Sequence, residues 1–374
     1  MSRGDGHWQS EQVYENSECY FDHLIVDIDR AKHSIVLESY IFQLDEVGRQ
    51  VLAALARAAD RQVRIKVLID GVGSYTDCAT IATELNRYGG EVKVFRPLPW
   101  RIDLYDLAVV KHKWYAKLIY FFSQINRRDH RKLCIIDEET AWVGSFNIVE
   151  HHPSDTNQKR LQDIGVRVQC DAVGHLLDDF HKIWFDKINT GRVGRFKYYL
   201  SNAGKRKRQY RNAFMLEKIA KARRRIWLYS AYFSPCDQIL EAFLQASKRG
   251  VDLRIMTPSE SDVAFFTAIT KTYYQTLLKS DIKIYEFSAG LLHSKAVLID
   301  DCCYLGSTNM NHRSYYHDLE LDVVLRKKAS IKELEDVFIR DFGCADSISF
   351  ETLGRTPLII RIFGSLLTLL KNWL

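Results

Sequence analysis

Two short stretches of the sequence place a histidine and a lysine two residues apart, directly before a run of apolar residues. His130 and Lys132 form the first pair, and His293 and Lys295 form the second. Side chains two residues apart in an extended chain point to the same face. Each histidine is therefore expected to lie beside its lysine at the mouth of a buried strand, where open α/β folds bind ligands.

This combination of side chains suits a phosphate ester. Lysine ammonium groups neutralise non-bridging oxygens, and a neutral imidazole can attack phosphorus. Each copy continues to an aspartate, Asp137 or Asp300, for which we expect a mainly structural role at the strand end. Each copy then reaches a Gly-Ser-x-Asn sequence, whose polar residues are expected to donate hydrogen bonds to the phosphate oxygens: Ser145, Asn147, Ser307 and Asn309.

The two copies occupy the same place in an internal repeat, which favours a functional role over ordinary buried polar groups. Each half begins with a strand, a helix and two further strands, and closes with a β-rich run after its His-x-Lys stretch. These elements are expected at 34–42, 47–62, 63–70, 91–97 and 164–170, and again at 225–233, 237–250, 251–258, 282–288 and 319–325. Strands alternating with helices predict an α/β fold, with a mostly parallel sheet flanked by helices in each half.

The doubled His-x-Lys-x4-Asp motif resembles the signature of the phospholipase D superfamily. The resemblance implies that the two halves pack about a pseudo-twofold axis and that both histidines meet in one site. It also implies a covalent phosphohistidine on one histidine, while the other protonates the leaving alcohol and deprotonates the incoming one. On this resemblance His130 is the nucleophile and His293 the general acid and base, although the sequence leaves the reverse open. No metal or other cofactor is implied, because two lysines supply the positive charge.

Each catalytic histidine needs a partner that fixes its tautomer. Asp163 and Glu320 occupy matching places just before or within the closing β-rich run of each half. They resemble the acidic partners that such enzymes use, and we expect them to orient the histidines.

Several further segments resemble bacterial-type cardiolipin synthases at matching places, among them LESYIF, VLIDGVGS, QDIGVRV and SAYFSP. The resemblance runs from roughly Val13 to Phe342. It implies that one phosphatidylglycerol phosphatidylates His130 and releases glycerol, and that a second phosphatidylglycerol then attacks to give cardiolipin. The alternatives are a phospholipase D hydrolase, a phosphatidylserine synthase that uses another acceptor, and a nucleic-acid phosphodiesterase.

The bulk composition fits a folded protein with anionic partners. The 374 residues are 47% hydrophobic and 27% charged, with a net charge of +6, which favours two domains and a phosphate-bearing or membrane partner. The basic run KRKRQYR supports nucleic acid, but it contains one aromatic residue and nothing else suggests base stacking, so none is expected. The eight cysteines form no CxxC pair, which favours a reducing compartment. We see no signal peptide and no spanning helix.

We divide the chain into a first half at 1–186, a basic linker at 187–213, a second half at 214–354 and an amphipathic helix at 355–374. Within the first half, an insert at 98–129 is rich in aromatic residues. This insert is interpreted as a lipid-facing lip or, alternatively, as a buried helical segment.

The terminal segment has polar or small residues at intervals of three or four, and the rest of it is apolar. Its polar or small residues are Arg361, Gly364, Ser365, Thr368, Lys371 and Asn372. Such a helix suits the membrane interface, and the alternative is a helix docked on the protein core or on a partner subunit. We expect a peripheral protein at the cytoplasmic face of the bacterial inner membrane that binds phosphatidylglycerol and other anionic lipids. The oligomeric state stays open.

Overall fold

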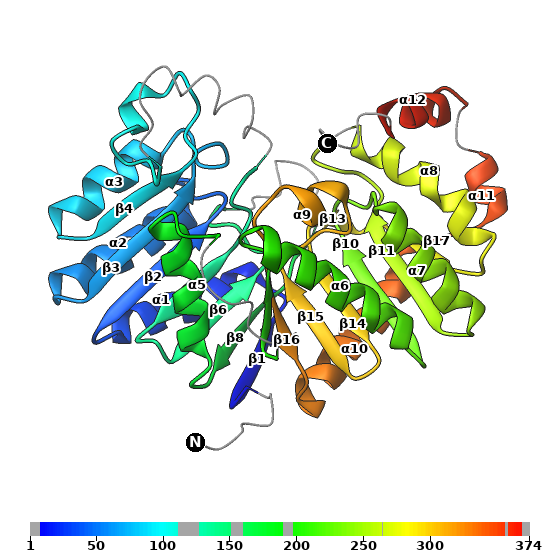
Figure 1. Ribbon diagram of the computed structural model, residues 1–374, viewed down its shortest axis with the longest axis horizontal. Helices are drawn as coiled ribbons and strands as arrows, with labels where there is room; N and C mark the ends of the chain where they lie inside the picture. Colours follow the sequence, from blue (N-terminus) through cyan, green and yellow to red (C-terminus); the bar gives the residue numbers. More distant parts are fainter. Residues whose placement is uncertain are drawn as a thin grey trace.

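The computed structural model describes residues 8–110, 127–150, 160–189, 197–263, 265–355 and 358–368. Within these residues the chain forms two α/β halves that lie side by side, each built on one large sheet with helices around it (Figure 1). The predicted architecture of two similar α/β halves is confirmed.

The first half contains a seven-stranded sheet with the order β1-β8-β6-β5-β2-β3-β4. The strands are β1 (Ser10–Tyr14), β2 (Ser34–Ser39), β3 (Arg64–Asp70), β4 (Glu91–Phe95), β5 (Leu133–Ile136), β6 (Thr140–Gly144) and β8 (Gly165–Gln169). The helices of this half are α1 (Ser17–Arg30), α2 (Glu46–Asp60), α3 (Cys78–Arg87) and α5 (Val173–Trp184), with a 3-10 turn η1 (Ile102–Leu104). The strands and the helix predicted from the repeat are all present, with small shifts at their ends.

The second half contains an eight-stranded sheet with the order β17-β12-β11-β10-β14-β15-β16-β9. The strands are β9 (Tyr199–Ser201), β10 (Arg225–Ser230), β11 (Asp252–Pro258), β12 (Lys283–Phe287), β14 (Lys295–Ile299), β15 (Cys302–Gly306), β16 (Leu321–Leu325) and β17 (Asp346–Ile348). The helices are α6 (Lys205–Lys221), α7 (Asp237–Lys248), α8 (Phe266–Leu278), α9 (His312–Tyr316), α10 (Lys328–Cys344), α11 (Phe350–Gly354) and α12 (Leu358–Thr368).

Both sheets are mixed, which corrects the expectation of mostly parallel sheets. β2, β3 and β4 run parallel to one another, as do β10, β11 and β12. The strands that follow each His-x-Lys pair instead form antiparallel hairpins, β5 with β6 and β14 with β15. A hairpin turn reverses the chain, whereas a parallel pair needs a long crossover connection. At the β5–β6 turn, Asp137 and Glu138 adopt positive φ angles of 52° and 62°.

Residues 197–213 of the segment interpreted as a basic linker contain β9 and the first part of α6. β9 pairs with β16 at the edge of the second sheet, and the basic run lies in α6. Lys207, Arg208 and Arg211 of this run are buried. Lys207 forms an ion pair with Asp179 of α5, so α6 connects the two halves. The burial of these cations is tolerated because each of them has an acidic or carbonyl partner.

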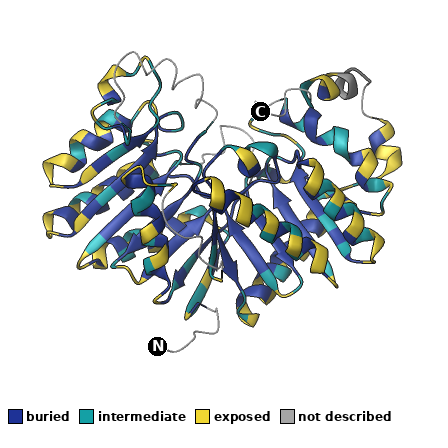
Figure 2. Cartoon of the chain, viewed as in Figure 1, coloured by how far each residue is buried: buried dark blue, intermediate teal, exposed yellow. Residues whose placement is uncertain are grey.

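A shared apolar core holds the two sheets against each other. β6 and β8 of the first half contact β15 and β16 of the second, and their buried side chains belong to one cluster. Its members include Val143, Val166, Val168, Leu298, Leu305 and Val323. Figure 2 shows the strands at this boundary as buried, with exposed residues gathered on the outer helices. The sheet contact therefore fixes the two His-x-Lys stretches relative to one another.

Candidate active site

The two His-x-Lys segments meet at the boundary between the halves, and backbone groups of the opposite half hold each one. The amide of His130 donates to the carbonyl oxygen of Leu319 at 3.0 Å, and the amide of His293 donates to that of Gln162 at 2.8 Å. Gln162 ends β7 (Arg160–Gln162), which pairs in parallel with β13 (Gly290–Leu292). The reciprocal backbone contacts bring both histidines to one place.

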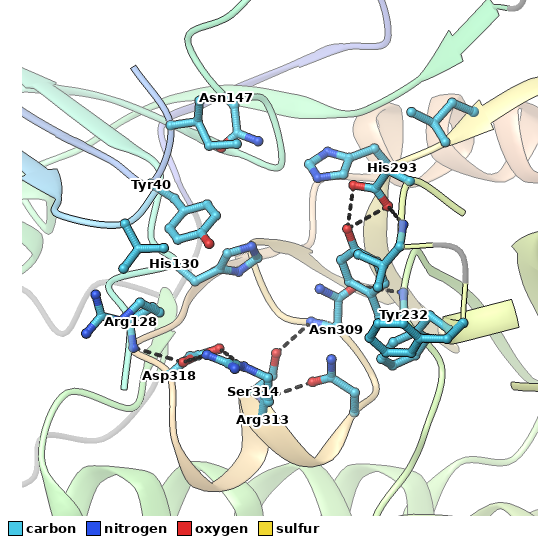
Figure 3. Close-up of a pocket in the computed structure, with 18 of the residues that line it drawn as sticks. Tyr40, Arg128, His130, Asn147, Tyr232, His293, Asn309, Arg313, Ser314 and Asp318 are labelled. Atoms are coloured by element: carbon cyan, nitrogen blue, oxygen red, sulfur yellow. Dashed lines mark hydrogen bonds and ion pairs between the residues drawn. The ribbon is translucent and has the colours of Figure 1, made fainter. Parts of the chain in front are cut away.

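Both histidines line a cavity of about 690 Å³ at the boundary (Figure 3). Asn147 and Asn309 line it as well, so two of the four predicted phosphate contacts face this space. Lys132 and Lys295 are buried behind the histidines, and their ammonium groups donate to the backbone oxygens of His130 and His293. The structure thus brings together both predicted His-Lys pairs.

The carboxylate partners of the histidines are exchanged between the halves. Nδ1 of His130 lies 3.2 Å from a carboxylate oxygen of Glu320, and Nδ1 of His293 lies 2.7 Å from one of Asp163. Both residues are the predicted ones, but the sequence pattern did not reveal that each serves the opposite half. A carboxylate at Nδ1 holds a proton on that nitrogen and leaves Nε2 of the neutral ring as the reactive atom.

The two serines of the Gly-Ser-x-Asn sequences do not line the cavity, which corrects their predicted role as phosphate donors. Ser145 donates to the carboxylate of Asp163, and Ser307 donates to that of Glu320. Both serines are fully buried. Their hydroxyl groups are therefore occupied in holding the carboxylates that orient the histidines.

Asp137 and Asp300 lie at the far ends of β5 and β14, away from the cavity. The carboxylate of Asp137 accepts the backbone N–H groups of residues 32–34 just before β2. The carboxylate of Asp300 accepts those of residues 223–225 in the same way. These contacts agree with the expected structural role and place both aspartates outside the reacting groups.

The two histidine–carboxylate pairs differ electrostatically. Burial and the charge of Lys132 lower the pKa of His130 well below its usual value. Burial also lowers the pKa of His293, but Asp163 opposes this change. Burial raises the pKa of Asp163, yet the charge and hydrogen bond of His293 outweigh it, and the pKa falls to about 2. Burial raises the pKa of Glu320. Both histidines therefore favour the neutral form, His130 the more strongly, and His293 beside ionised Asp163 is the better placed of the two to hold a proton.

Burial makes the positive charges of the two lysines energetically costly. Burial, followed by the charge of Lys295, lowers the pKa of Lys132 to about 7. Burial lowers the pKa of Lys295 to about 8. A bound phosphodiester brings negative charge to this place and restores the ammonium forms. The site therefore has the electrostatic character of a phosphate receptor.

A cluster of buried charged side chains surrounds Arg131, the middle residue of the first His-x-Lys motif. Arg131 lies between His130 and Lys132 and forms an ion pair with Glu38 at 3.1 Å, with both side chains fully buried. Asp129, Asp179 and Lys207 lie around this pair and couple it to α6. The second motif has Ser294 at the matching position, so this cluster belongs to one half alone.

Several cavity residues were not singled out from the sequence. They are Tyr40, Arg128, Tyr232, Asp262, Arg313 and Asp318. Tyr40 contacts the ring of His130 at a centroid distance of 5.1 Å. Tyr40 and Tyr232 follow β2 and β10, within the similar segments LESYIF and SAYFSP, so the repeat contained a signal for them. The remaining four have no counterpart of similar chemistry in the other half.

The described residues contain neither a cluster of metal ligands nor a helix that could span a membrane. In the parts of the chain that the structure describes, no three His, Cys, Asp or Glu side chains are grouped as metal ligands. Among the same residues, no helix combines the length and the apolar character needed to cross a bilayer.

The comparisons with known proteins agree with this site. The family described as cardiolipin synthase, PLD-like domain, matches residues 24–184 and 215–342. A cardiolipin synthase from Geobacillus sp. is 30% identical over 378 residues, which cover 96% of this chain and 71% of that protein. One from Clostridium perfringens is 27% identical over 380 residues, which cover 96% and 76%. The chain belongs to the cardiolipin synthase, PLD-like domain family, and the predicted resemblance is confirmed.

The fold has a close counterpart among solved structures. The crystal structure of a phosphatidylserine synthase from Haemophilus influenzae aligns with a TM-score of 0.69 and 13% sequence identity. The alignment covers 97% of this chain and 95% of that one. At this identity the likeness establishes the shared two-half fold.

Replacing either carboxylate should disable the histidine of the opposite half. Asp163→Asn and Glu320→Gln should each lower kcat roughly 100-fold or more, because the ring loses the partner that fixes its tautomer. NMR of the imidazole nitrogens should show that Asp163→Asn alters the titration of His293 and leaves that of His130 nearly unchanged. Glu320→Gln should do the reverse. An effect of Asp163→Asn on His130 alone would contradict the exchanged pairing.

The activity should decline in alkaline solution. Each lysine is charged below its pKa and neutral above it, so kcat/KM for the lipid donor should fall as the pH rises through about 7 to 8. The fall in kcat should occur at higher pH, because bound phosphate favours the ammonium forms. A Lys132→Arg variant keeps its charge and should retain a single alkaline step. A kcat/KM that is flat to pH 9 would disprove this account of the lysines.

Proposed function

We propose that the chain is a cardiolipin synthase, which transfers a phosphatidyl group from one phosphatidylglycerol to another and releases glycerol. As a member of its family it is a phosphatidyltransferase of the phospholipase D superfamily. The names of its relatives support the lipid substrates. The observation that carries the proposed mechanism is the pair of histidines that face one cavity, each bound to a carboxylate of the opposite half.

In the first proposed step, Nε2 of neutral His130 attacks the phosphorus of phosphatidylglycerol. A phosphorus–nitrogen bond forms, the bond to the glycerol oxygen breaks, and protonated His293 gives its proton to that oxygen. Lys132 and Lys295 balance the negative charge of the phosphoryl oxygens. The lowered pKa of His130 and the ionised partner of His293 support these roles.

In the second proposed step, the now neutral His293 accepts a proton from a hydroxyl group of a second phosphatidylglycerol. The oxygen of that hydroxyl attacks phosphorus, the bond to His130 breaks, and cardiolipin forms. The walls of the cavity are largely apolar, with Val72, Leu98, Val263 and Phe266 among them. An apolar entrance limits the access of water to the intermediate and favours transfer over hydrolysis.

The rival functions have weaker support. A phospholipase D hydrolase or a phosphatidylserine synthase would use the same histidines and differ in the acceptor alone. The nucleic-acid alternative rested on the basic run of α6, but Lys207, Arg208 and Arg211 of that run are buried. Their charges are not presented to a nucleic-acid backbone.

We also propose that the protein contacts a membrane beside the cavity, through α12 and the start of the aromatic insert. α12 packs on α8 (Figure 1). A Cβ at Gly364 would lie 2.3 Å from the carbonyl oxygen of Ala268, so the two helices touch through this glycine. Phe363 and Leu366 of α12 remain 49% and 59% exposed. The helix thus combines the docking alternative with an outward apolar face.

The first half supports the same proposal from the other side of the cavity. Trp100 and Ile102 are 67% and 75% exposed, and they follow Leu98, which lines the cavity. Residues 111–126 of the insert and 369–374 of the terminal segment lie outside the described residues. The expected cytoplasmic location is kept as a proposal and is supported by eight unpaired cysteines.

The proposed function predicts specific products from vesicles of phosphatidylglycerol labelled in its headgroup. The purified protein, with a chelator present, should form cardiolipin and free labelled glycerol. His130→Ala and His293→Ala should each lose at least roughly 1000-fold of this activity, since either variant removes a reacting group. Phosphatidic acid as the lipid product would instead identify a hydrolase.

The roles of the two histidines are separated with a donor whose leaving group needs no proton, such as a p-nitrophenyl phosphatidyl ester. His293→Ala should still release a burst of p-nitrophenol and retain a phosphatidyl group on His130, whereas His130→Ala should do neither. A covalent adduct on His293 would reverse the assignment.

The proposed membrane contact predicts weaker binding when the outer face of α12 is charged. Phe363→Glu together with Leu366→Glu should lower partition onto phosphatidylglycerol vesicles roughly 10-fold or more, because two apolar side chains no longer enter the interface. Ile339→Glu on α10 is a matched control, because Ile339 is equally exposed but lies away from α12. Equal binding by the α12 variant and the native protein in vesicle sedimentation would refute the contact.

A further inference from the structure

We propose that Asp262, held in place by Tyr232, recognises the glycerol headgroup through its hydroxyl groups on the His293 side of the cavity. The inference rests on the proposed function and deepens it, since it names the residue that selects the leaving and the accepting alcohol. Asp262 would accept hydrogen bonds from the glycerol hydroxyls that do not react.

The reaction itself requires such a subsite. The group that leaves in the first step is glycerol, and the group that attacks in the second step is the glycerol headgroup of another phosphatidylglycerol. In an in-line displacement the leaving and entering oxygens lie opposite the nucleophile. Both therefore occupy the space next to His293, the proposed acid and base, while His130 lies across the phosphorus. One subsite that binds a polyol serves both steps.

The arginine and aspartate side chains on the His130 side of the cavity are already paired with one another or with Asp70. The guanidinium of Arg313 donates two hydrogen bonds of 3.0 Å to the carboxylate of Asp318. Arg128 lies 3.7 Å from the carboxylate of Asp70, and its amide donates to Asp318. Figure 3 shows Arg128, Arg313 and Asp318 together on this side. This network is close to neutral and is occupied internally.

The His293 side differs, because its carboxylate is in no direct ion pair among the described residues, although the charge of Lys295 acts on it. Asp262 lines the cavity and accepts hydrogen bonds from the hydroxyl of Tyr232, with oxygen–oxygen distances of 2.7 and 2.8 Å. The hydroxyl of Ser261 and the amide of Val263 also donate to this carboxylate. Within the described ranges of the chain, Asp262 forms no ion pair. A carboxylate with lone pairs to spare, facing a binding cavity, suits a ligand that brings hydroxyl donors.

Tyr232 ties this carboxylate to the phosphate-facing residues. The backbone amide of Tyr232 donates to the side-chain oxygen of Asn309 at 3.2 Å. Figure 3 shows Tyr232 and His293 on the same side of the cavity. Asn309, Tyr232 and Asp262 are thus linked by hydrogen bonds, and these bonds set the distance between Asn309 and the carboxylate proposed to accept the glycerol hydroxyls.

The same wall offers a path for the acyl chains of the acceptor. The ring of Tyr232 packs edge-on against Phe266 at a centroid distance of 5.0 Å. Phe266 begins α8, the helix that carries α12, and the neighbouring Val263 and Phe265 also line the cavity. A lipid whose headgroup reaches Asp262 can therefore lay its apolar part along α8. A polar selector next to an apolar wall matches the two parts of a phosphatidylglycerol.

Acceptor competition on the full-length protein tests this proposal. The protein is incubated with phosphatidylglycerol vesicles and with labelled glycerol, ethanolamine or 1-propanol, and kcat/KM is measured for transfer to each alcohol. 1-Propanol has the carbon chain of glycerol but lacks its two further hydroxyl groups. The native protein should prefer glycerol to both other acceptors. Asp262→Ala should lower the ratio of glycerol to 1-propanol use roughly 10-fold, the scale of a hydrogen bond to a charged group.

Two further variants grade the effect. Asp262→Asn keeps an acceptor oxygen without the charge and should lie between the native protein and Asp262→Ala. Tyr232→Phe keeps the ring but frees the carboxylate, and it should lower the same ratio by a smaller factor. Asp336→Ala, which removes one charge from an exposed position on α10, should leave the ratio unchanged.

The outcomes are distinct. An unchanged ratio in Asp262→Ala, with cardiolipin still formed by the native protein, would overturn the inference and leave the proposed function standing. A preference of the native protein for ethanolamine over glycerol would also overturn it, since the carboxylate would then select an ammonium group. Absence of transfer from phosphatidylglycerol by the native protein would overturn the proposed function and the inference together.

Discussion

The exchange of histidine partners between the halves is the constraint on which the rest of the structure depends. His130 is bound to Glu320, and His293 to Asp163, so neither half contains a complete histidine–carboxylate pair. The sheets must therefore pack in one orientation, and the apolar cluster shared by β6, β8, β15 and β16 provides it. The parallel pairing of β7 with β13 and the ion pair between α5 and α6 secure the same boundary from two further sides. The boundary between the halves therefore contains both the apolar core that joins them and the cavity with the two histidines.

The site concentrates charge at a largely buried place. Two lysines, two histidines and two carboxylates are all largely buried within it. Isolated charges at such depth are costly, and the chain offsets the cost with local partners. Ser145 and Ser307 donate to the carboxylates, and the lysines donate to the backbone of the histidines. What the chain leaves unbalanced is positive charge near Lys132, which the negative charge of a phosphodiester would balance. Burial thus favours anionic ligands, because a bound anion would stabilise the charged forms of the two buried lysines.

Much of the site was predictable because the motif occurs twice. A repeat reveals matching residues, and His130, Lys132, Asp163 and Glu320 with their counterparts were found in this way. The repeat could not reveal which half each carboxylate serves, since exchanged and unexchanged pairings give the same sequence spacing. The prediction for Ser145 and Ser307 was wrong because a hydroxyl group close to the motif can donate to a phosphate or to a carboxylate. The sequence does not distinguish these two partners, and in the structure both serines donate to carboxylates. The mostly parallel sheet was wrong because the alternation of strands and helices in the first part of each half does not continue past the motif, where two or three residues join the next strands and permit only a hairpin. Asp262, Arg313 and Asp318 were missed because they lie outside the repeated pattern.

The exchanged contacts also bear on how such a chain can diverge. A residue of one half that binds the other half, answered by the same contact in return, is the arrangement of a twofold dimer, in which both copies must be identical. Joining the copies in one polypeptide removes that requirement while keeping the geometry. The two halves of this chain do differ. An aspartate binds one histidine and a glutamate binds the other, and Arg131 of the first motif corresponds to Ser294 of the second. The polar residues that line the cavity also differ between its two sides. A symmetric receptor would treat both sides of a phosphorus atom alike. Covalent linkage of the halves permits the two histidines to take different roles, as we propose for His130 and His293.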